Sequence, residues 1–344
     1  MAQRNVTWMA ADPYATLTSL MALTVSVVVP TYNRSARLAR LLDGLAAQEG
    51  VSDFEVVVVD DASTDDTSQL LARRASDLPF ELTAIRQERN AGPAAARNRG
   101  WRTARAPIIC FTDDDCVPTP KWLAEIVAAF DAADIVQGQT LPNPDQSDNW
   151  GPFSRTIHID WEMGYYETCN MGYRRDVLEQ LDGFDESFRH PFGEDMDLAW
   201  RAKRQGAASA FAPDALVHHD IFESSWRAAM KEVRRREGLV LAYKRNPGLR
   251  QQLGKGVFGG PTHLPTLVVA LAAIRLGRRP RSGRRWALSA AAGAWYAYLM
   301  RYEHHGPRQG IWAWPAVIPA AYLVDLAQMA VLVRASVRYR TLVL

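Results

Sequence analysis

The chain has 344 residues, enough for one large domain with an appendage or for two modest domains. Its hydrophobic content of 48% and charged content of 23% are those of a globular protein and argue against a disordered chain. The formal net charge of +2 argues against a nucleic-acid binder with a uniformly basic surface, so we expect no nucleic-acid partner.

Short apolar runs alternate with helical patterns from residue 24 onward. Residues 25–29 are rich in valine and end at Pro30, which is typical of a strand buried on both faces. Ser35 can then cap a helix. That helix carries four leucines on one face, namely Leu38, Leu41, Leu42 and Leu45.

The same alternation continues to residue 130. The later predicted strands lie at residues 54–59, 82–86 and 107–112. The later predicted helices lie at residues 65–74, from Gly92-Pro93 onward, and from Thr119-Pro120 through residue 130. The last of these is indicated by a threonine N-cap followed by proline at the first helical position.

Strands that alternate with helices predict the α/β class, with a mostly parallel sheet flanked by helices and joined by right-handed crossovers. In such a sheet, ligands bind beyond the carboxyl ends of the strands. Three of the four predicted strands end in polar residues, at 30–33, 60–61 and 113–115. We therefore expect these residues to gather along one edge of the sheet.

Asp113, Asp114 and Asp115 stand side by side after the fourth predicted strand. Like charges this close repel one another unless a positive charge neutralises them. A divalent cation does so best, and hard oxygen ligands suit Mg²⁺ or Mn²⁺. The alternative is a solvated acidic turn without a ligand.

Six motifs in chain order resemble those of the family-2 inverting glycosyltransferases. The nucleotide-binding motifs are VVVPTYN at 27–33, VDDASTD at 59–65, NAG at 90–92 with ARN at 96–98, and DDD at 113–115. The acceptor-side motifs are GFDE at 183–186 and GEDMDL at 193–198. The resemblance covers about residues 24–225. It implies a GT-A, Rossmann-like fold and metal-dependent, inverting transfer of a hexose from a nucleotide diphosphate.

The resemblance also implies which residues hold the donor. Pro30, Thr31 and Tyr32 would shape the base pocket, with the Tyr32 ring against the base. Asp61 would accept the imide N–H of uracil or thymine, and Arg97 would help to hold the nucleotide. A pocket that reads the imide edge suits a UDP-sugar and a dTDP-sugar alike.

The cation site follows from the same resemblance. Asp113 and Asp115 would be the Asp-x-Asp pair, which contacts the ribose side and the metal that bridges the diphosphate. Asp114 would also lie on the donor side, and this third carboxylate leaves open which aspartate binds Mn²⁺ or Mg²⁺. In similar enzymes a histidine after a short strand completes the metal shell, which favours His219 over His218. Either histidine also fits a structural or surface position.

Asp195 is the predicted catalytic residue. In a helix from Gly193 to residue 205 it shares a face with three core residues, namely Leu198, Ala199 and Ala202. The helix dipole tolerates a carboxylate at this first turn, and that stabilising role is the alternative to catalysis. In the family, the second residue of the Glu-Asp pair is the general base, which here is Asp195.

Other residues complete the predicted acceptor side. We expect Glu194, Asn170 and Trp161 to lie there. Glu194 also belongs to a polar stripe with Asp197, Arg201 and Arg204, in which Asp197 and Arg201 form an i,i+4 ion pair.

The pattern changes after residue 226, so we divide the chain into a tail at 1–22, a catalytic domain at 23–225 and a helical region at 226–344. Apolar segments lie at residues 264–276, 286–300 and 311–333, with an arginine cluster at residues 275–285. The first two are too short to span a bilayer. The third is interrupted by Pro315, Pro319, Asp325 and Gln328, and a mid-span Asp costs about 3 kcal/mol.

Interfacial helices on an anionic leaflet fit these segments, so we expect the helical region to associate with a membrane surface. The alternative is a packed soluble subdomain that forms a homodimer surface. Three cysteines without a C-x-x-C pair, and a start that does not resemble a secretory signal, favour a reducing compartment. We expect the cytoplasmic face of the cell membrane, or the cytoplasm if the subdomain is soluble.

The expected role is cell envelope polysaccharide biosynthesis, with a glycan or lipid-linked acceptor. Two rival functions stay open. A sugar-nucleotide nucleotidyltransferase would need a glycine-rich basic loop directly after the first strand, and residues 30–33 do not form one. A catalytically silent membrane scaffold of the same fold would not need Asp113, Asp115 and Asp195.

Overall fold

The computed structural model describes residues 23–188, 192–253, 256–278, 290–291, 293–297 and 314–344. These residues divide into two compact units. Unit 1 contains residues up to 144 together with 156–220, and unit 2 contains residues 145–155 together with 221–344. The division after residue 220 lies close to the sequence-based boundary at 225, and the predicted tail at 1–22 lies outside the described residues.

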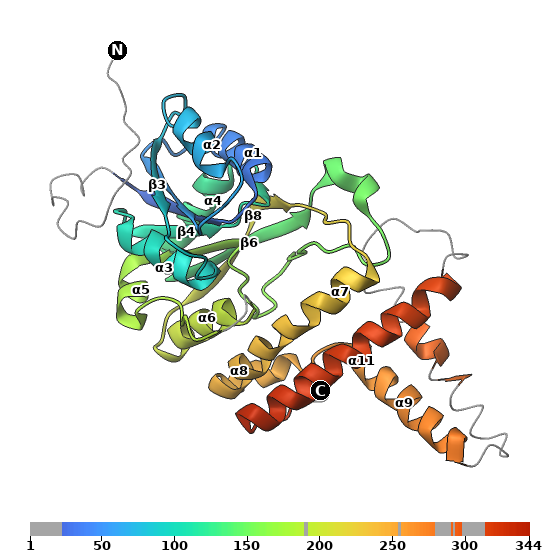
Figure 1. The fold of residues 1–344 in the computed structure, drawn as a ribbon. Coiled ribbons are helices and arrows are strands. Elements are labelled where there is room, and N and C mark those ends of the chain that lie inside the picture. Colours follow the sequence, from blue (N-terminus) through green and yellow to red (C-terminus); the bar gives the residue numbers. More distant parts are fainter. Residues whose placement is uncertain (1–22, 189–191, 254–255, 279–289, 292, 298–313) are drawn as a thin grey trace. The chain divides into compact units, whose positions relative to one another are not determined.

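The first half of unit 1 is a parallel sheet with helices between its strands (Figure 1). Its strands are β1 (Val25–Thr31), β2 (Phe54–Asp60), β3 (Glu81–Arg86) and β4 (Ile108–Thr112). Its helices are α1 (Ser35–Ala46), α2 (Thr67–Arg74) and α3 (Pro93–Thr103). Strand β1 pairs in parallel with both β2 and β4, so the three polar strand ends lie side by side as expected.

The second half of unit 1 extends the same sheet with mixed directions. It contains the strands β5 (Cys116–Pro118), β6 (Ile135–Pro142), β7 (Asn170–Arg174) and β8 (Ser209–His219). It also contains the helices α4 (Trp122–Ala128), α5 (Arg175–Leu181) and α6 (Glu194–Arg204) and the short 3₁₀ helix η2 (Ala129–Asp131). The strand order of the described sheet is β3-β2-β1-β4-β7-β6-β8-β5, with antiparallel pairs at β4–β7, β7–β6 and β8–β5. The α/β class is confirmed, and the sheet is mixed.

Alternating side chains of the central strands build a hydrophobic core on each face of the sheet. Val27 and Val29 of β1 face one core, to which α1, α2 and α4 contribute. Val28 faces the other core, to which α3, α5 and α6 contribute. The four leucines predicted for one face of α1 are fully buried in the first core. Both faces of the sheet are therefore covered, and its edge remains for the site.

Two predicted helix caps are wrong. Arg34 occupies the N-cap position of α1, while the Ser35 hydroxyl donates to Asp66 Oδ1 at 2.6 Å. Helix α4 begins at Trp122, and the Thr119 hydroxyl donates to the carbonyl oxygen of Leu216 at 3.0 Å. In both cases a neighbouring segment offers the hydroxyl a partner outside its own helix.

Unit 2 is helical. It contains α7 (Trp226–Glu232), α8 (Glu237–Arg245), α9 (His263–Arg278) and α11 (Trp314–Tyr339), with short 3₁₀ helices at η3 (Pro144–Asn149), η4 (Val233–Arg236) and η5 (Pro247–Gln252). Helix α11 packs against α7, η4, α8 and α9. The predicted segment at 264–276 lies in α9, and most of 311–333 lies in α11. Most of the segment at 286–300 and of the arginine cluster lies outside the described residues.

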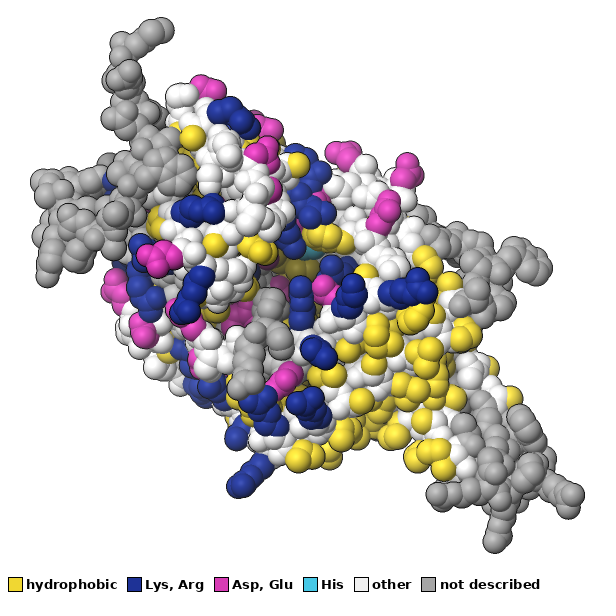
Figure 2. Space-filling view, in the orientation of Figure 1, with side chains coloured by type: hydrophobic (Ala, Val, Ile, Leu, Met, Phe, Trp, Pro, Cys, Tyr) yellow, Lys and Arg dark blue, Asp and Glu magenta, His cyan; other side chains and the backbone are white. Residues whose placement is uncertain are grey.

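Unit 2 also carries exposed apolar side chains, and Figure 2 shows a broad hydrophobic area over its helices. Within the described ranges, Val317–Tyr339 of α11 is a helix long and apolar enough to cross a membrane, with a mean hydropathy of 1.5. Asp325, which interrupts this segment in the sequence, is buried and accepts a hydrogen bond from the Tyr296 hydroxyl at 2.9 Å. The outward face of α11 is therefore more apolar than its sequence alone indicates.

Candidate functional site

The loops that follow β1 and β2 are bound to each other. Asn33 has a positive φ of 52°, a conformation that asparagine tolerates. Its side-chain Oδ1 accepts from the backbone N–H of Thr64 at 2.6 Å, and its own N–H donates to the Ser63 hydroxyl at 2.8 Å. The predicted base-pocket segment around Pro30 is thereby fixed beside the end of β2. Tyr32 is 44% exposed there.

Asp61 is buried at the end of β2 and binds the loop that precedes α3. Its carboxylate accepts from the backbone N–H groups of Ala91 and Gly92, both at 2.8 Å, and from Gln87 Nε2 at 2.7 Å. Because a carboxylate has about four acceptor positions, one remains for a further donor. Asp61 therefore shapes this loop in addition to its predicted part in base recognition.

Asp114 is turned inward. Its carboxylate accepts from the Thr31 hydroxyl at 2.8 Å and from Arg34 Nη1 at 2.8 Å. Burial, together with the neighbouring charge of Asp115, raises the pKa of Asp114 to about 7, while Arg34 opposes that shift. Both Thr31 and Asp114, which we predicted to contact the donor, are thus engaged with each other inside the protein.

Asp115 faces His219 across the edge of the sheet. Asp115 Oδ1 lies 3.5 Å from His219 Nε2, and Asp115 Oδ2 accepts from Arg34 Nη1 at 2.7 Å. The antiparallel register places Cys116 opposite His219, and the ligand atoms of Asp115, Cys116 and His219 all lie within 4.8 Å of one another. His218 pairs with Val117 instead, so His219 is the histidine beside the aspartates.

The far side of the His219 ring is held by the loop at 156–157 and by its own chain. Nδ1 lies 2.8 Å from the carbonyl oxygen of Asp220 and 3.2 Å from the Thr156 hydroxyl. A proton on Nδ1 that is donated to this carbonyl leaves the Nε2 lone pair directed at Asp115. Among the described residues Asp115 Oδ1 has no hydrogen-bond partner. A carboxylate oxygen and an imidazole nitrogen in this arrangement fit a shared Mn²⁺ or Mg²⁺ ion.

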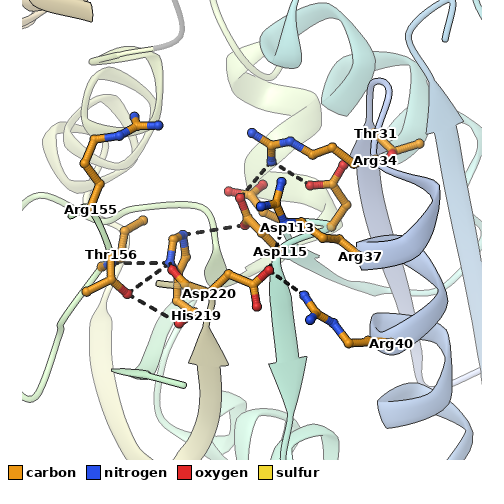
Figure 3. A network of polar contacts seen from close by, with 12 residues as sticks. Thr31, Arg34, Arg37, Arg40, Asp113, Asp115, Arg155, Thr156, His219 and Asp220 are labelled. Atoms are coloured by element: carbon orange, nitrogen blue, oxygen red, sulfur yellow. Dashed lines mark hydrogen bonds and ion pairs between the residues drawn. The ribbon is translucent and has the colours of Figure 1, made fainter. Parts of the chain in front are cut away.

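A row of three arginines, one at the N-cap of α1 and two on that helix, borders this group, and it was not predicted from the sequence. Arg34 contacts Asp115, while Arg37 Nε donates to Asp220 Oδ2 at 2.9 Å and Arg40 contacts the same oxygen. Figure 3 shows the three arginines pointing from α1 and its N-cap toward these carboxylates. Their spacing of three residues, which puts them on one helix face, was the available signal.

Arg97 joins the end of β4 to the start of α6. Its guanidinium is buried, with Nη2 donating to Asp113 Oδ1 at 2.8 Å and Nη1 donating to Glu194 Oε1 at 3.3 Å. Burial, with a further contribution from Asp195, raises the pKa of Glu194 to about 7. The arginine therefore holds together carboxylates from the predicted donor side and the predicted acceptor side.

Asp195 lies in the first turn of α6, which begins after Gly193 at a φ of 101°. Its Oδ1 accepts from the backbone N–H of Met196 at 2.8 Å, and burial raises its pKa above the ordinary value. The core residues predicted to share its face are buried, as expected. The predicted Asp197–Arg201 ion pair is confirmed at 2.8 Å.

Glu167 is a further acidic residue near Asp195, and sequence reasoning missed it. Burial, followed by repulsion from Asp195, raises its pKa from the ordinary value of 4.5 to about 7. Gln137 Nε2 on β6 donates to its carboxylate at 3.2 Å. Glu167 precedes β7 in a stretch without a motif, so only the tertiary structure reveals it.

The two remaining acceptor-side predictions have different outcomes. Asn170 is fully buried, with Oδ1 accepting from Trp122 Nε1 at 2.8 Å and Nδ2 donating to the carbonyl oxygens of Gln139 and Ala215, both at 2.8 Å. It therefore links β7 to its neighbours inside unit 1, because its amide satisfies buried backbone groups rather than facing an open acceptor side. Trp161 is 61% exposed, so it remains available for contacts with another molecule.

The chain is similar to known glycosyltransferases. A family model described as Glycosyl transferase family group 2 matches residues 108–324, and one described as Glycosyl transferase family 2 matches residues 26–182. The glycosyltransferase AglE of Haloferax volcanii is 29% identical over 205 residues, which cover 57% of this chain and 66% of the relative. The chain spans less than two thirds of the length of the first curated relatives it matches.

Solved structures share the fold. Staphylococcus aureus TarS 1-349 in complex with UDP-GlcNAc has a TM-score of 0.51 and 18% identity, with 93% of both chains covered. The mannosyltransferase PcManGT from Pyrobaculum calidifontis has a TM-score of 0.50 and 22% identity, with 97% of this chain and 85% of that chain covered. These likenesses confirm the predicted GT-A type of fold, although the sheet is mixed rather than mostly parallel.

Proposed function

The chain belongs to the family-2 glycosyltransferases, and on that premise we propose that it transfers a hexose from UDP or dTDP to a hydroxyl of a glycan or lipid-linked acceptor. The observation that carries the proposal is the Arg97 bridge between Asp113 and Glu194, next to Asp195. It brings the donor motif and the acceptor motif into one group. One of these solved structures is a complex with UDP-GlcNAc and the other is a complex with GDP-Man and Mn²⁺, which supports a nucleotide-sugar donor.

The donor is held at the ends of β1, β2 and β4. The exposed ring of Tyr32 stacks on the base, and the remaining acceptor position of Asp61 receives the imide N–H. Bound between Asp115 and His219, a Mn²⁺ or Mg²⁺ ion would offset the negative charge of the diphosphate. Asp113, held by Arg97, faces the ribose side.

Asp195 acts as the general base. Its carboxylate takes the proton of the acceptor hydroxyl while the oxygen attacks the anomeric carbon, and the bond to the diphosphate oxygen breaks on the opposite face. The sugar configuration is inverted in this single displacement, which requires no protein nucleophile. A carboxylate whose pKa is raised by burial suits the role, because a stronger base accepts the proton more readily.

We further propose that unit 2 seats the enzyme on the cytoplasmic face of a membrane. Exposed apolar side chains lie on α7, α9, α11 and nearby segments (Figure 2). They are Trp226, Val268, Leu271, Ile274, Trp295, Leu323, Val333, Val337 and Leu342. Since Asp325 is bound to Tyr296 within the unit, its charge does not oppose an interfacial position. A lipid-linked acceptor would then be within reach in the same membrane.

The experiment that tests the proposed reaction follows donor and product together. Purified protein is screened by thermal shift against UDP, dTDP and GDP, with Mn²⁺ and with a chelator, and then given candidate nucleotide sugars. Transfer releases a nucleoside diphosphate, whereas the rival nucleotidyltransferase consumes a nucleoside triphosphate and releases pyrophosphate. A shift with UDP or dTDP only in the presence of Mn²⁺, followed by diphosphate release, supports the proposal. Tight nucleotide binding that a chelator does not change would contradict the proposed need for a divalent cation.

A further inference from the structure

A thiol lies in the group proposed above to bind a hard cation. Cys116 is fully buried on β5, and its Sγ lies within 4.8 Å of ligand atoms of both Asp115 and His219. The antiparallel register sets Cys116 directly opposite His219, so the two side chains project from the same face of the sheet. Mg²⁺ and Mn²⁺ prefer oxygen and nitrogen ligands, which leaves this sulfur without a part in the proposed reaction.

The distance between Asp115 Oδ1 and His219 Nε2 suits tetrahedral coordination of a metal ion. Metal–ligand bonds of about 2.0–2.1 Å in a tetrahedral site put neighbouring ligand atoms roughly 3.3 Å apart. Asp115 Oδ1 and His219 Nε2 are 3.5 Å apart. A zinc-sized ion therefore fits between them with little movement of either side chain.

The buried carboxylate provides a second, independent observation. Asp115 is 8% exposed, and within the described part of the chain its Oδ1 has no hydrogen-bond partner. A buried acceptor without a donor is costly, and a bound ion is one way in which proteins satisfy it. The Cys169 thiol contacts Cys116 and lies 3.7 Å from the Thr140 hydroxyl, so a second sulfur lies next to the first.

We propose that Asp115, Cys116 and His219 form a binding site for a thiophilic divalent cation such as Zn²⁺ or Co²⁺, with Cys116 Sγ as a ligand. Three protein ligands leave the fourth tetrahedral position for water or another oxygen. The thiol proton passes to the solvent when the sulfur–metal bond forms. Zn²⁺ and Co²⁺ bind such mixed sites more tightly than Mn²⁺ does. An ion held in this way occupies Asp115 and His219, so these residues can no longer bind the Mn²⁺ or Mg²⁺ of the proposed reaction.

The absorption spectrum of bound Co²⁺ depends on which atoms are its ligands, so the test titrates Co²⁺ into the full chain. A thiolate ligand produces a sulfur-to-cobalt charge-transfer band in the near ultraviolet, and oxygen and nitrogen ligands do not. We expect this band in the unmodified protein, its loss in Cys116→Ala, and its retention in Cys110→Ala. Cys110 is the matched control, because it is equally buried but lies outside the ligand group.

Cobalt that binds without the band, or a band that persists in Cys116→Ala, would overturn the proposal. Failure of Co²⁺ to bind would overturn it as well. If Cys116→Ala does not fold, zinc-edge X-ray absorption on the unmodified protein decides the matter without a variant. Sulfur in the first coordination shell supports the site, and a shell of nitrogen and oxygen alone refutes it. Both measurements are independent of sugar transfer, so the proposed reaction can fail without affecting this result, and the reverse also holds.

Discussion

The guanidinium of Arg97 on α3 lies 3.3 Å from the carboxylate of Glu194 on α6, and both side chains are buried. The same guanidinium binds Asp113 at 2.8 Å. This one guanidinium thus lies between two carboxylates that are 81 residues apart in the sequence. Because water does not screen buried charges well, this link couples the position of α6 to the end of β4.

Replacing Arg97 with methionine should strongly destabilise unit 1. It leaves Asp113 and Glu194 without their partner, and breaking a buried pair in this way costs about 3–5 kcal/mol. Arg102→Ala is the control, since Arg102 lies on the same helix but pairs with Asp182 at the surface, which is worth about 1 kcal/mol or less. Urea unfolding measures both variants. Equal losses of stability would show that the Arg97 bridge is not a structural link.

Asp195→Asn should reduce the transfer rate by a factor of at least 100 while nucleotide binding stays close to that of the unmodified enzyme. The amide keeps the shape of the carboxylate but cannot accept the proton, and general-base catalysis contributes about 10²–10⁴-fold. Glu167→Gln is the matched control, because Glu167 is the neighbouring carboxylate with no assigned part in the chemistry. If Glu167→Gln is inactive and Asp195→Asn retains activity, the roles must be exchanged.

The stability of the protein should fall as pH rises from about 5 to 8. Glu167 has a pKa raised from 4.5 to about 7, so in this range the folded state binds more protons than the unfolded state. The free energy of unfolding then decreases with pH, by at most about 1.4 kcal/mol per pH unit for one such group. Glu167→Gln removes this contribution and should flatten the slope measured by denaturant unfolding at several pH values. An unchanged slope would mean that Glu167 titrates normally.

Substitutions in the aspartate cluster should separate a cation ligand from a structural residue. We expect Asp115→Asn and His219→Ala each to weaken Mn²⁺ binding at least tenfold, because they remove the two facing ligand atoms. Asp114→Asn should instead lower stability with little change in Mn²⁺ affinity, since Asp114 is bound to Thr31 and Arg34. Calorimetric Mn²⁺ titration reports the affinities, and thermal unfolding reports the stabilities. Loss of Mn²⁺ binding in Asp114→Asn alone would reverse this assignment.

The membrane proposal predicts flotation with anionic vesicles at low salt. Val337, 76% exposed on α11, lies on the proposed contact face, so Val337→Glu should reduce the floating fraction. Ser76→Glu adds the same charge to an exposed position of unit 1 and should leave flotation unchanged. Interfacial binding weakens with added salt, whereas a spanning α11 would resist it. Absence of flotation, together with a dimer that Val337→Glu dissociates, would favour the soluble subdomain with a homodimer surface.

Local patterns account for much of the fold. Valine-rich runs identified β1 and β2, and a short apolar run identified β4. The spacing of leucines identified the buried face of α1. These signals depend only on neighbours along the chain. The parallel pairing of these strands then follows from the alternation of strands and helices. Consequently the sequence sufficed to bring the three polar strand ends to one edge and to set Asp195 in the first turn of its helix.

Only the tertiary structure decided which partner each polar side chain takes. Asn170 donates a hydrogen bond to a backbone carbonyl of the sheet. Asp220 forms ion pairs with two arginines of α1, and Asp325 accepts a hydrogen bond from Tyr296. Residues 145–155 likewise join unit 2 across a large separation in sequence. Such choices depend on which groups packing brings within about 3 Å of one another, and on whether water still reaches them. No periodicity along the chain carries that information, so the composition of the site could be predicted from the sequence only where a motif was present.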